Sequence, residues 1–184
     1  SGMKRFLFGL CFFLMVGSSW TVDAFDETQL QELQLLGESC PSCDLSWAKL
    51  SKEDLSGRNL TEADLTQAYL NGANLSGANL TNAKLTSAHL GTANLSKANL
   101  TWADLSGANL VSADFTGANL TWAFFSRAKL GGANLTWANL TGSKNISFAR
   151  GLSVETGDWS GRITSTVIIC NTTMPDGTVN NSDC

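Results

Sequence analysis

The chain has 184 residues, of which 43% are hydrophobic and 15% charged, and its formal net charge is −4 at pH 7. This mildly acidic balance disfavours a basic surface that would bind the phosphates of nucleic acids.

The N-terminus has the pattern of an export signal. The first two residues are interpreted as added for expression. Residues 3–24 then join a basic start to an apolar run and a small-residue ending at Ala24, as a secretory signal peptide does. The apolar run from Phe6 to Val16 is shorter than the roughly 20 residues of a transmembrane helix. We therefore expect cleavage after Ala24 and an exported mature protein without stable membrane insertion.

Residues 25–39 are predicted to form a short amphipathic α-helix. Leucines recur among Gln and Glu, acidic residues stand at the front, and Gly37 stands near the end, which are helix start and stop signals. We expect this helix to cap the repetitive segment that follows, because the ends of stacked repeats otherwise expose apolar core and unpaired backbone.

Residues 40–144 are organised by a repeat of five residues. A leucine or phenylalanine stands at every fifth position from Leu45 to Leu140, and from Ala63 onward an alanine precedes it by two positions. The unit therefore reads A-[N/D]-L-[S/T]-x. A period of five fits neither one face of a helix nor one face of a continuous strand.

A turn at the end of each unit removes this conflict. Alanine and leucine then point the same way on a short extended side, and each turn aims the next pair at the same axis. The frequent Gly, Ser, Thr and Asn residues suit such corners. Four sides make a square coil of about 20 residues, so the segment predicts about five coils stacked at roughly 4.8 Å.

The repeat resembles the pentapeptide-repeat family over the whole of residues 40–144. The resemblance implies an all-β fold, the right-handed quadrilateral β-helix, and a non-catalytic protein that binds or scaffolds another protein. Some cytoplasmic members are acidic mimics of DNA that bind type II topoisomerases, so a DNA-mimic inhibitor is the alternative function. The mild acidity of this chain and its predicted export favour a monomeric binding or scaffold module whose partner is unknown.

The cysteine pattern agrees with export. Once Cys11 leaves with the signal peptide, the remaining cysteines are Cys40, Cys43, Cys170 and Cys184. They allow three pairings. The spacing of Cys40 and Cys43 is shared by redox motifs and structural clips, and we favour a structural disulfide. Cys170 would then pair with Cys184 across a turn, whereas a zinc site is disfavoured because no histidine accompanies the cysteines.

Residues 145–184 break the repeat and are predicted to form a C-terminal cap that ends in a disulfide-tied hairpin or loop. The stretch from Cys170 to Val179 resembles the tails of exported cyanobacterial pentapeptide-repeat proteins. This resemblance implies a periplasm or a thylakoid lumen as the compartment.

The coil places outward residues that are 20 positions apart in columns. Asn59, Asn79, Asn99, Asn119 and Asn139 form one column, and Asp54, Asn74, Asn94, Asp114 and Asn134 form another. We expect these side chains to hydrogen-bond nearby backbone at the turns and to ladder with copies of themselves. No metal site is expected from them.

Outward aromatic residues give the candidate partner-binding patch. Trp102 and Trp122 share a column, Phe124 occupies a position that is normally Asn or Asp, and Trp137 falls on the side just before. Exposed apolar patches often mark binding sites. The alternative is that the rings lie flat on the corners and only shield the backbone.

No catalytic constellation is evident. His89 is the sole histidine, and its column places it between Tyr69 and Asn109 on the outside of the coil. Neither a glycine-rich phosphate loop nor a nucleophile elbow occurs. An enzyme is therefore not expected, and no catalytic or cofactor-binding residue is assigned.

Overall fold

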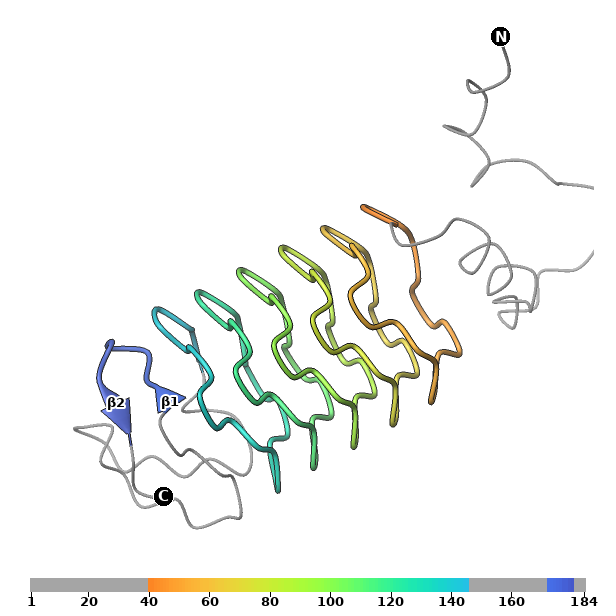
Figure 1. Ribbon diagram of the computed structural model, residues 1–184. Helices are drawn as coiled ribbons and strands as arrows, with labels where there is room; N and C mark the ends of the chain where they lie inside the picture. The colour runs from red at the N-terminus through yellow and green to blue at the C-terminus, as the bar shows by residue number, and fades with distance from the viewer. Residues whose placement is uncertain (1–39, 146–171, 181–184) are drawn as a thin grey trace, which may run out of the picture.

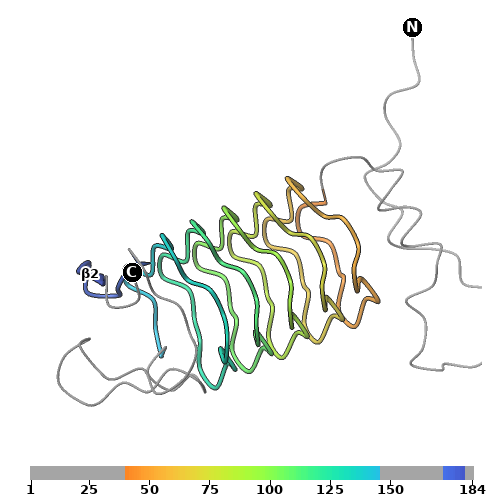
Figure 2. The ribbon, with the colours of Figure 1, turned by 60° about the horizontal axis from the view of Figure 1, so that its bottom comes forward.

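The computed structural model describes residues 40–145 and 172–180. Residues 40–145, called the solenoid below, wind into a rod of similar coils stacked along one axis (Figure 1), and the same regular stacking is visible from a second direction (Figure 2). Parallel backbone bridges join residues 20 apart, such as Asn59 with Asn79 and Tyr69 with His89. This register confirms the predicted square coil.

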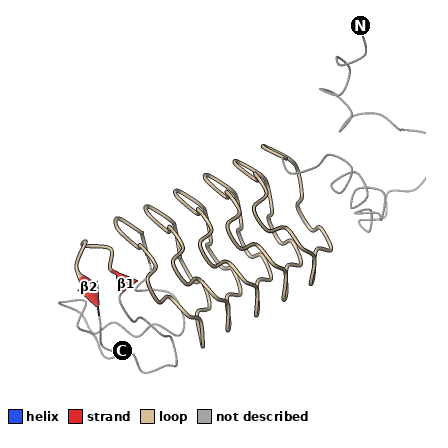
Figure 3. Ribbon diagram, in the orientation of Figure 1, coloured by secondary structure: helices blue, strands red, loops and turns tan. Residues whose placement is uncertain are grey.

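Each side of a coil contributes an isolated bridge residue instead of a longer strand (Figure 3). The reason is the turn that follows every inward leucine. In one such turn the N–H of Ala48 donates to the carbonyl of Leu45 at 3.1 Å, and the equivalent bond recurs in every unit up to Ser143 and Leu140. The corners therefore lie where the sequence predicts them.

The core is a ladder of alternating large and small side chains. The leucines from Leu45 to Leu140, with Phe115 and Phe125 in the same register, are at most 3% exposed. The alanines from Ala63 to Ala138 are at most 1% exposed. The predicted inward pattern is confirmed, and each buried leucine contributes about 1.5 to 3 kcal/mol of gross hydrophobic stabilisation.

Backbone hydrogen bonds hold each side on the next coil. Lys84 shows the pattern: its N–H donates to Ala63 at 2.9 Å and its carbonyl accepts from Leu65 at 2.7 Å. A further bond at the corner runs from the N–H of Gln67 to the carbonyl of Thr86 at 2.9 Å. The coils are therefore paired by main-chain groups, and the outward side chains are left to other roles.

The second residue of each turn adopts a left-handed backbone. Its φ lies between 57° and 72° at every corner from Ser42 to Gly142. Glycine adopts such a φ without strain, but Thr92, Lys97 and Trp102 adopt it as well. The sequence analysis did not anticipate this strain, because the variable last position of the unit accepts many residue types.

A short hairpin lies against the last coil, at the end of the rod opposite the first coil, which is coloured orange (Figure 1). It consists of β1 (Thr172–Thr173) and β2 (Val179–Asn180), which are antiparallel. The N–H of Thr173 donates to Ala138 at 2.8 Å, and the carbonyl of Thr173 accepts from Leu140 at 2.7 Å. On this side of the rod, β1 therefore takes the place of one further coil.

Several predicted segments lie outside the described residues: the signal peptide (3–24), the helical cap (25–39), residues 146–171 of the C-terminal cap, Cys170 and Cys184. Within residues 40–145 and 172–180, no helix has the length and apolar character needed to cross a membrane.

Candidate functional site

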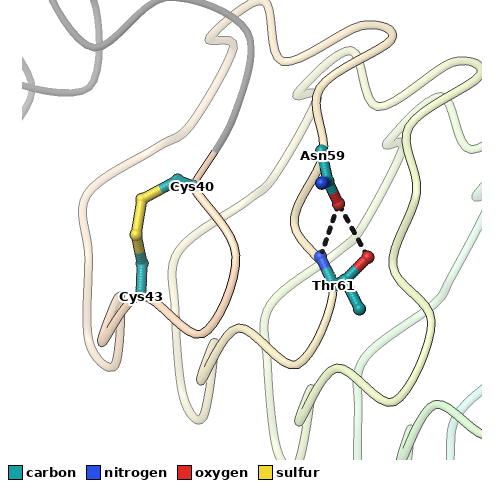
Figure 4. The surroundings of a disulfide bond; sticks show 4 residues. All are labelled: Cys40, Cys43, Asn59 and Thr61. Carbon is teal, nitrogen blue, oxygen red and sulfur yellow. Dashed lines mark hydrogen bonds between the residues drawn. A yellow bond between two sulfur atoms is a disulfide. The ribbon is translucent and has the colours of Figure 1, made fainter.

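The asparagine column supports the corners. The Oδ1 atom of Asn59 accepts hydrogen bonds from the backbone N–H of Thr61 at 3.2 Å and from its hydroxyl at 2.7 Å (Figure 4). The same pair of bonds recurs at the other members of the column, each with the threonine two residues on; these asparagines are Asn79, Asn99, Asn119 and Asn139. The predicted role of asparagine in bonding nearby backbone is confirmed.

The aspartate-containing column is built in the same way. Asp54 accepts from the backbone N–H of Ser56 at 3.0 Å, and the amide of Asn74, one coil on, donates to Asp54 at 3.0 Å. The hydrogen bonds from Ser56 lower the pKa of Asp54. The predicted ladder is thus present at this rung, and the carboxylate is held as part of a corner.

The ion pair between Asp64 and Lys84 also links neighbouring coils, with Nζ 3.6 Å from Oδ2. Partial burial acts to raise the pKa of Asp64, but hydrogen bonds from Thr66 and the charge of Lys84 outweigh it, and the pKa is lowered. In the part of the chain that the structure describes, no group of three or more His, Cys, Asp or Glu side chains could hold a metal ion.

The aromatic corner, defined as Trp102, Trp122 and Phe124, is a cluster of aromatic side chains on the surface of the solenoid. Trp102 and Trp122 stack with ring centroids 5.4 Å apart and planes inclined by 12°. Phe124 packs against Trp102 at 6.4 Å with its ring tilted by 41°. The two indoles are 44% and 41% exposed, so the stack is accessible from solvent.

A lysine completes this cluster. The Nζ atom of Lys144 lies 5.8 Å from the ring centroid of Trp102 and 5.4 Å from that of Phe124. Both distances are within the range of a cation–π interaction. Sequence analysis did not include Lys144 in the patch, although it stands in the same column as Phe124.

Trp137 is not part of the corner. It is 64% exposed, and among the described residues no ring contact joins it to Trp102, Trp122 or Phe124. The structure therefore brings together three of the four residues of the predicted patch, and Trp137 lies apart from them. Trp47, at 48% exposure, is another tryptophan on a corner, and it has no ring contact with a residue in 40–145 or 172–180.

The last coils of the solenoid carry three cations, of which Lys144 lies over the rings of the aromatic corner. Residues 115–145 contain Arg127, Lys129 and Lys144 but no Asp or Glu, and all three cations are exposed. Residues 115–145 therefore carry only positive charges, although Asp104 stands one coil before Phe124 in the same column and Asp176 lies in the turn of the hairpin.

His89 stacks on Tyr69 of the preceding coil, with centroids 4.9 Å apart and planes inclined by 3°. It lies on the outer surface, as the column arithmetic predicts. The same arithmetic could have predicted the stack, because the two residues are 20 positions apart.

Cys40 and Cys43 form a disulfide at the N-terminal end of the solenoid (Figure 4). Their Cα atoms are 5.6 Å apart. Cys40 is buried and takes the place of the inward leucine, while Cys43 is partly exposed and takes the place of alanine. The predicted pairing of these two cysteines is therefore present in the structure.

Comparisons with known proteins agree with this repeat. A family model described as pentapeptide repeats matches 8 copies, over residues 42–77, 59–96, 93–132, 108–144 and 125–150. No curated protein matches the chain.

Solved structures of repeat proteins are similar to the chain. A pentapeptide repeat protein from the thylakoid lumen of Arabidopsis thaliana is 34% identical, over 61% of this chain and 70% of that one, with a TM-score of 0.42. HetL of the cyanobacterium Nostoc sp. strain PCC 7120, involved in heterocyst differentiation regulation, is 25% identical, over 83% and 98%, with a TM-score of 0.22. QnrB1, a plasmid-mediated fluoroquinolone resistance protein, is 22% identical, over 70% and 78%, with a TM-score of 0.38.

Proposed function

Because the chain belongs to the pentapeptide-repeat family of right-handed β-helices, we propose that it is a non-catalytic module that binds a protein partner through the aromatic corner. The observation that carries this proposal is the exposed stack of Trp102 and Trp122 with Phe124 beside it. Tryptophan is enriched among the residues that dominate binding energies at protein interfaces.

The chemistry around the corner indicates the kind of partner. Lys144 lies over the rings of Trp102 and Phe124, and residues 115–145 carry two further cations and no Asp or Glu. A partner surface that presents apolar side chains together with carboxylates would complement both the rings and these cations. We expect binding to weaken as salt is added, since exposed charges are screened.

The Asn and Thr side chains argue against catalysis as the main role of the surface. Their hydrogen-bonding groups are committed to the corners, as at Asn99 and Thr101, where the threonine hydroxyl donates to the amide oxygen at 2.6 Å. A hydroxyl bound in this way lacks the adjacent base that activates a nucleophile. His89 is stacked on Tyr69, and among the described residues it has no ring contact with the aromatic corner.

Export is part of the proposal. It is supported by the signal-like pattern of residues 3–24 and by the disulfide between Cys40 and Cys43, a bond that is rare in cytosolic proteins. We place the mature protein in a periplasm or a thylakoid lumen, as a monomer.

The charge of the rod favours this function over the DNA-mimic alternative. Residues 40–145 contain eight Lys or Arg and seven Asp or Glu residues. A mimic of DNA needs a strong excess of carboxylates to present the charge of the phosphate backbone. We expect the chain to leave DNA supercoiling by a type II topoisomerase unchanged, and protection or inhibition of that enzyme would support the mimic instead.

The binding proposal is tested by capture followed by titration. A protein retained by the purified chain from the exported compartment is isolated, and its affinity is measured for the parent and for a Trp102→Ser, Trp122→Ser double variant. We expect the double variant to bind about tenfold more weakly or worse, as loss of a tryptophan hot spot requires. Circular dichroism checks that the variant is folded.

Trp47→Ser is the matched control, because Trp47 occupies the same position of the repeat and is equally exposed but has no aromatic neighbour in the described residues. The control should bind like the parent. Equal affinities for the parent, the double variant and the control would contradict the assignment of the aromatic corner.

A further inference from the structure

We propose that the disulfide between Cys40 and Cys43 is a thiol–disulfide exchange site, which accepts two electrons from a dithiol while the solenoid stays folded. The proposal goes beyond the binding function and does not depend on it. It also revises the sequence-based interpretation of this disulfide as a structural clip.

The disulfide spans a single corner of the rod. Pro41 and Ser42 are the two turn residues and are exposed, and Cys43 is partly exposed, whereas Cys40 is 7% exposed. The closed loop is very short, so the bond constrains the unfolded chain far less than a disulfide that closes a long loop. The fold therefore depends little on the bond.

The corner differs from all the others in one backbone contact. Every later turn, from Leu45 and Ala48 to Leu140 and Ser143, has a hydrogen bond from the fourth residue to the first. Among the described residues, the turn from Cys40 to Cys43 lacks this bond. The disulfide stands in its place, and opening the disulfide would leave the turn free to form the bond that the rest of the repeat forms.

The scaffold holds both cysteines without the help of the disulfide. The N–H of Cys40 donates to Asn59 at 2.8 Å, and the carbonyl of Cys43 accepts from the N–H of Asp64 at 2.8 Å. The N–H of Ser42 donates to Thr61 at 2.8 Å. Because these bonds run to the next coil, the two thiols of the reduced form would stay close enough to pair again.

The reaction needs only a dithiol of the thioredoxin class as reductant. Its thiolate attacks Sγ of Cys43, the more exposed of the two residues. A mixed disulfide forms, the bond to Cys40 breaks, and Cys40 leaves as a thiolate that takes up a proton. The second thiol of the reductant then loses its proton and attacks the mixed disulfide. Cys43 is released and protonated, so the chain gains two electrons and two protons and the dithiol becomes a disulfide.

The test is reduction under native conditions. The oxidised full chain is incubated with reduced thioredoxin, free thiols are alkylated, and Cys40 and Cys43 are followed individually by mass spectrometry. We expect both to become alkylated, the circular dichroism spectrum to stay unchanged, and oxidised glutathione to restore the disulfide. A disulfide that opens only in denaturant, or coils that melt on reduction, would overturn the proposal.

A backbone measurement tests the mechanism separately. The N–H of Cys43 should become protected from hydrogen exchange by about tenfold on reduction, as expected for one new hydrogen bond. A Cys40→Leu, Cys43→Ala double variant, which restores the repeat pattern, should fold and show the same protection. Failure of this variant to fold would show that the disulfide is structural and would refute the exchange site.

Discussion

The indole of Trp122 lies over Gly142, the residue 20 positions further along the same corner: a Cβ atom on Gly142 would come within 2.5 Å of Cε3 of the ring. This contact explains why the aromatic stack ends at Trp122. The next coil must have a glycine at that corner, because any side chain there would displace the ring of Trp122.

Gly142→Ala should therefore displace the Trp122 ring and weaken its stack with Trp102. We expect a loss of about 2 kcal/mol in the free energy of unfolding, from the overpacked contact and the left-handed backbone together. Denaturant unfolding measures the loss, and near-UV circular dichroism reports the stack. Gly57→Ala is the control, because Gly57 has the same φ but nothing within 4 Å of its added Cβ. Equal effects of both substitutions would contradict the contact.

Thr92→Asn should stabilise the rod. Thr92 is a β-branched residue with a φ of 59°, whereas asparagine tolerates the left-handed region better. We expect a gain of about 0.5 to 1 kcal/mol, less any contribution from the lost hydroxyl bond to Gly91. Thermal melting measures it. Thr101 is the first residue of its turn, one position before the left-handed residue. Thr101→Asn should destabilise the rod instead, because the hydroxyl of Thr101 donates to Asn99. A gain at both positions would argue that backbone strain is not the cause.

Asn99→Ala should destabilise the rod by about 1 to 2 kcal/mol, because it leaves the N–H and hydroxyl of Thr101 without their acceptor. Asn99→Asp keeps an acceptor oxygen at the same place and should cost much less. Chemical denaturation compares the two variants. If the aspartate variant were as unstable as the alanine variant, the hydrogen bonds would not be the reason for the asparagine column.

Asp64 should make the stability depend on pH in the acidic range. Its pKa is lower in the folded chain than in the unfolded chain, so the unfolded state takes up the proton first as the pH falls. The stabilisation from Asp64 is thus present above the unfolded pKa of about 3.9 and is lost as the pH falls through the folded value.

The measurement is the free energy of unfolding of the parent and of Asp64→Asn between neutral pH and acid. The parent's advantage over the variant should shrink as the pH falls, and high salt should reduce the part that comes from Lys84. A difference between the two proteins that stays constant with pH would rule out this explanation.

The fold could be predicted from the sequence because one rule is repeated without interruption. Inward leucines and alanines, the 20-residue register and the position of the corners all follow from the period of five. The left-handed corners could not be predicted, since Trp102 or Thr92 at the last position of a unit gives no local sign of a positive φ. Main-chain bonding between the coils imposes that conformation on whatever residue stands there.

The sequence predicted contacts in the candidate site only between residues that are 20 positions apart. Trp102 and Trp122 are 20 positions apart, so their stacking follows from the register. Trp137 lies at the preceding corner of the coil, where side chains point in another direction. Lys144 was missed because its long side chain extends past Phe124 to Trp102, two coils away. The spacing of residues in the sequence does not show how far a side chain extends.

The hairpin at the end of the rod has a consequence for how the chain can vary in length. β1 bonds to the side of the solenoid that carries Asn139, and the disulfide corner occupies a fixed side of the first coil. Deletion or duplication of 20 residues would leave these two ends in the same rotational phase. A change of five residues would turn the hairpin by a quarter of a revolution relative to Cys40, and the ends of the rod would then face different directions.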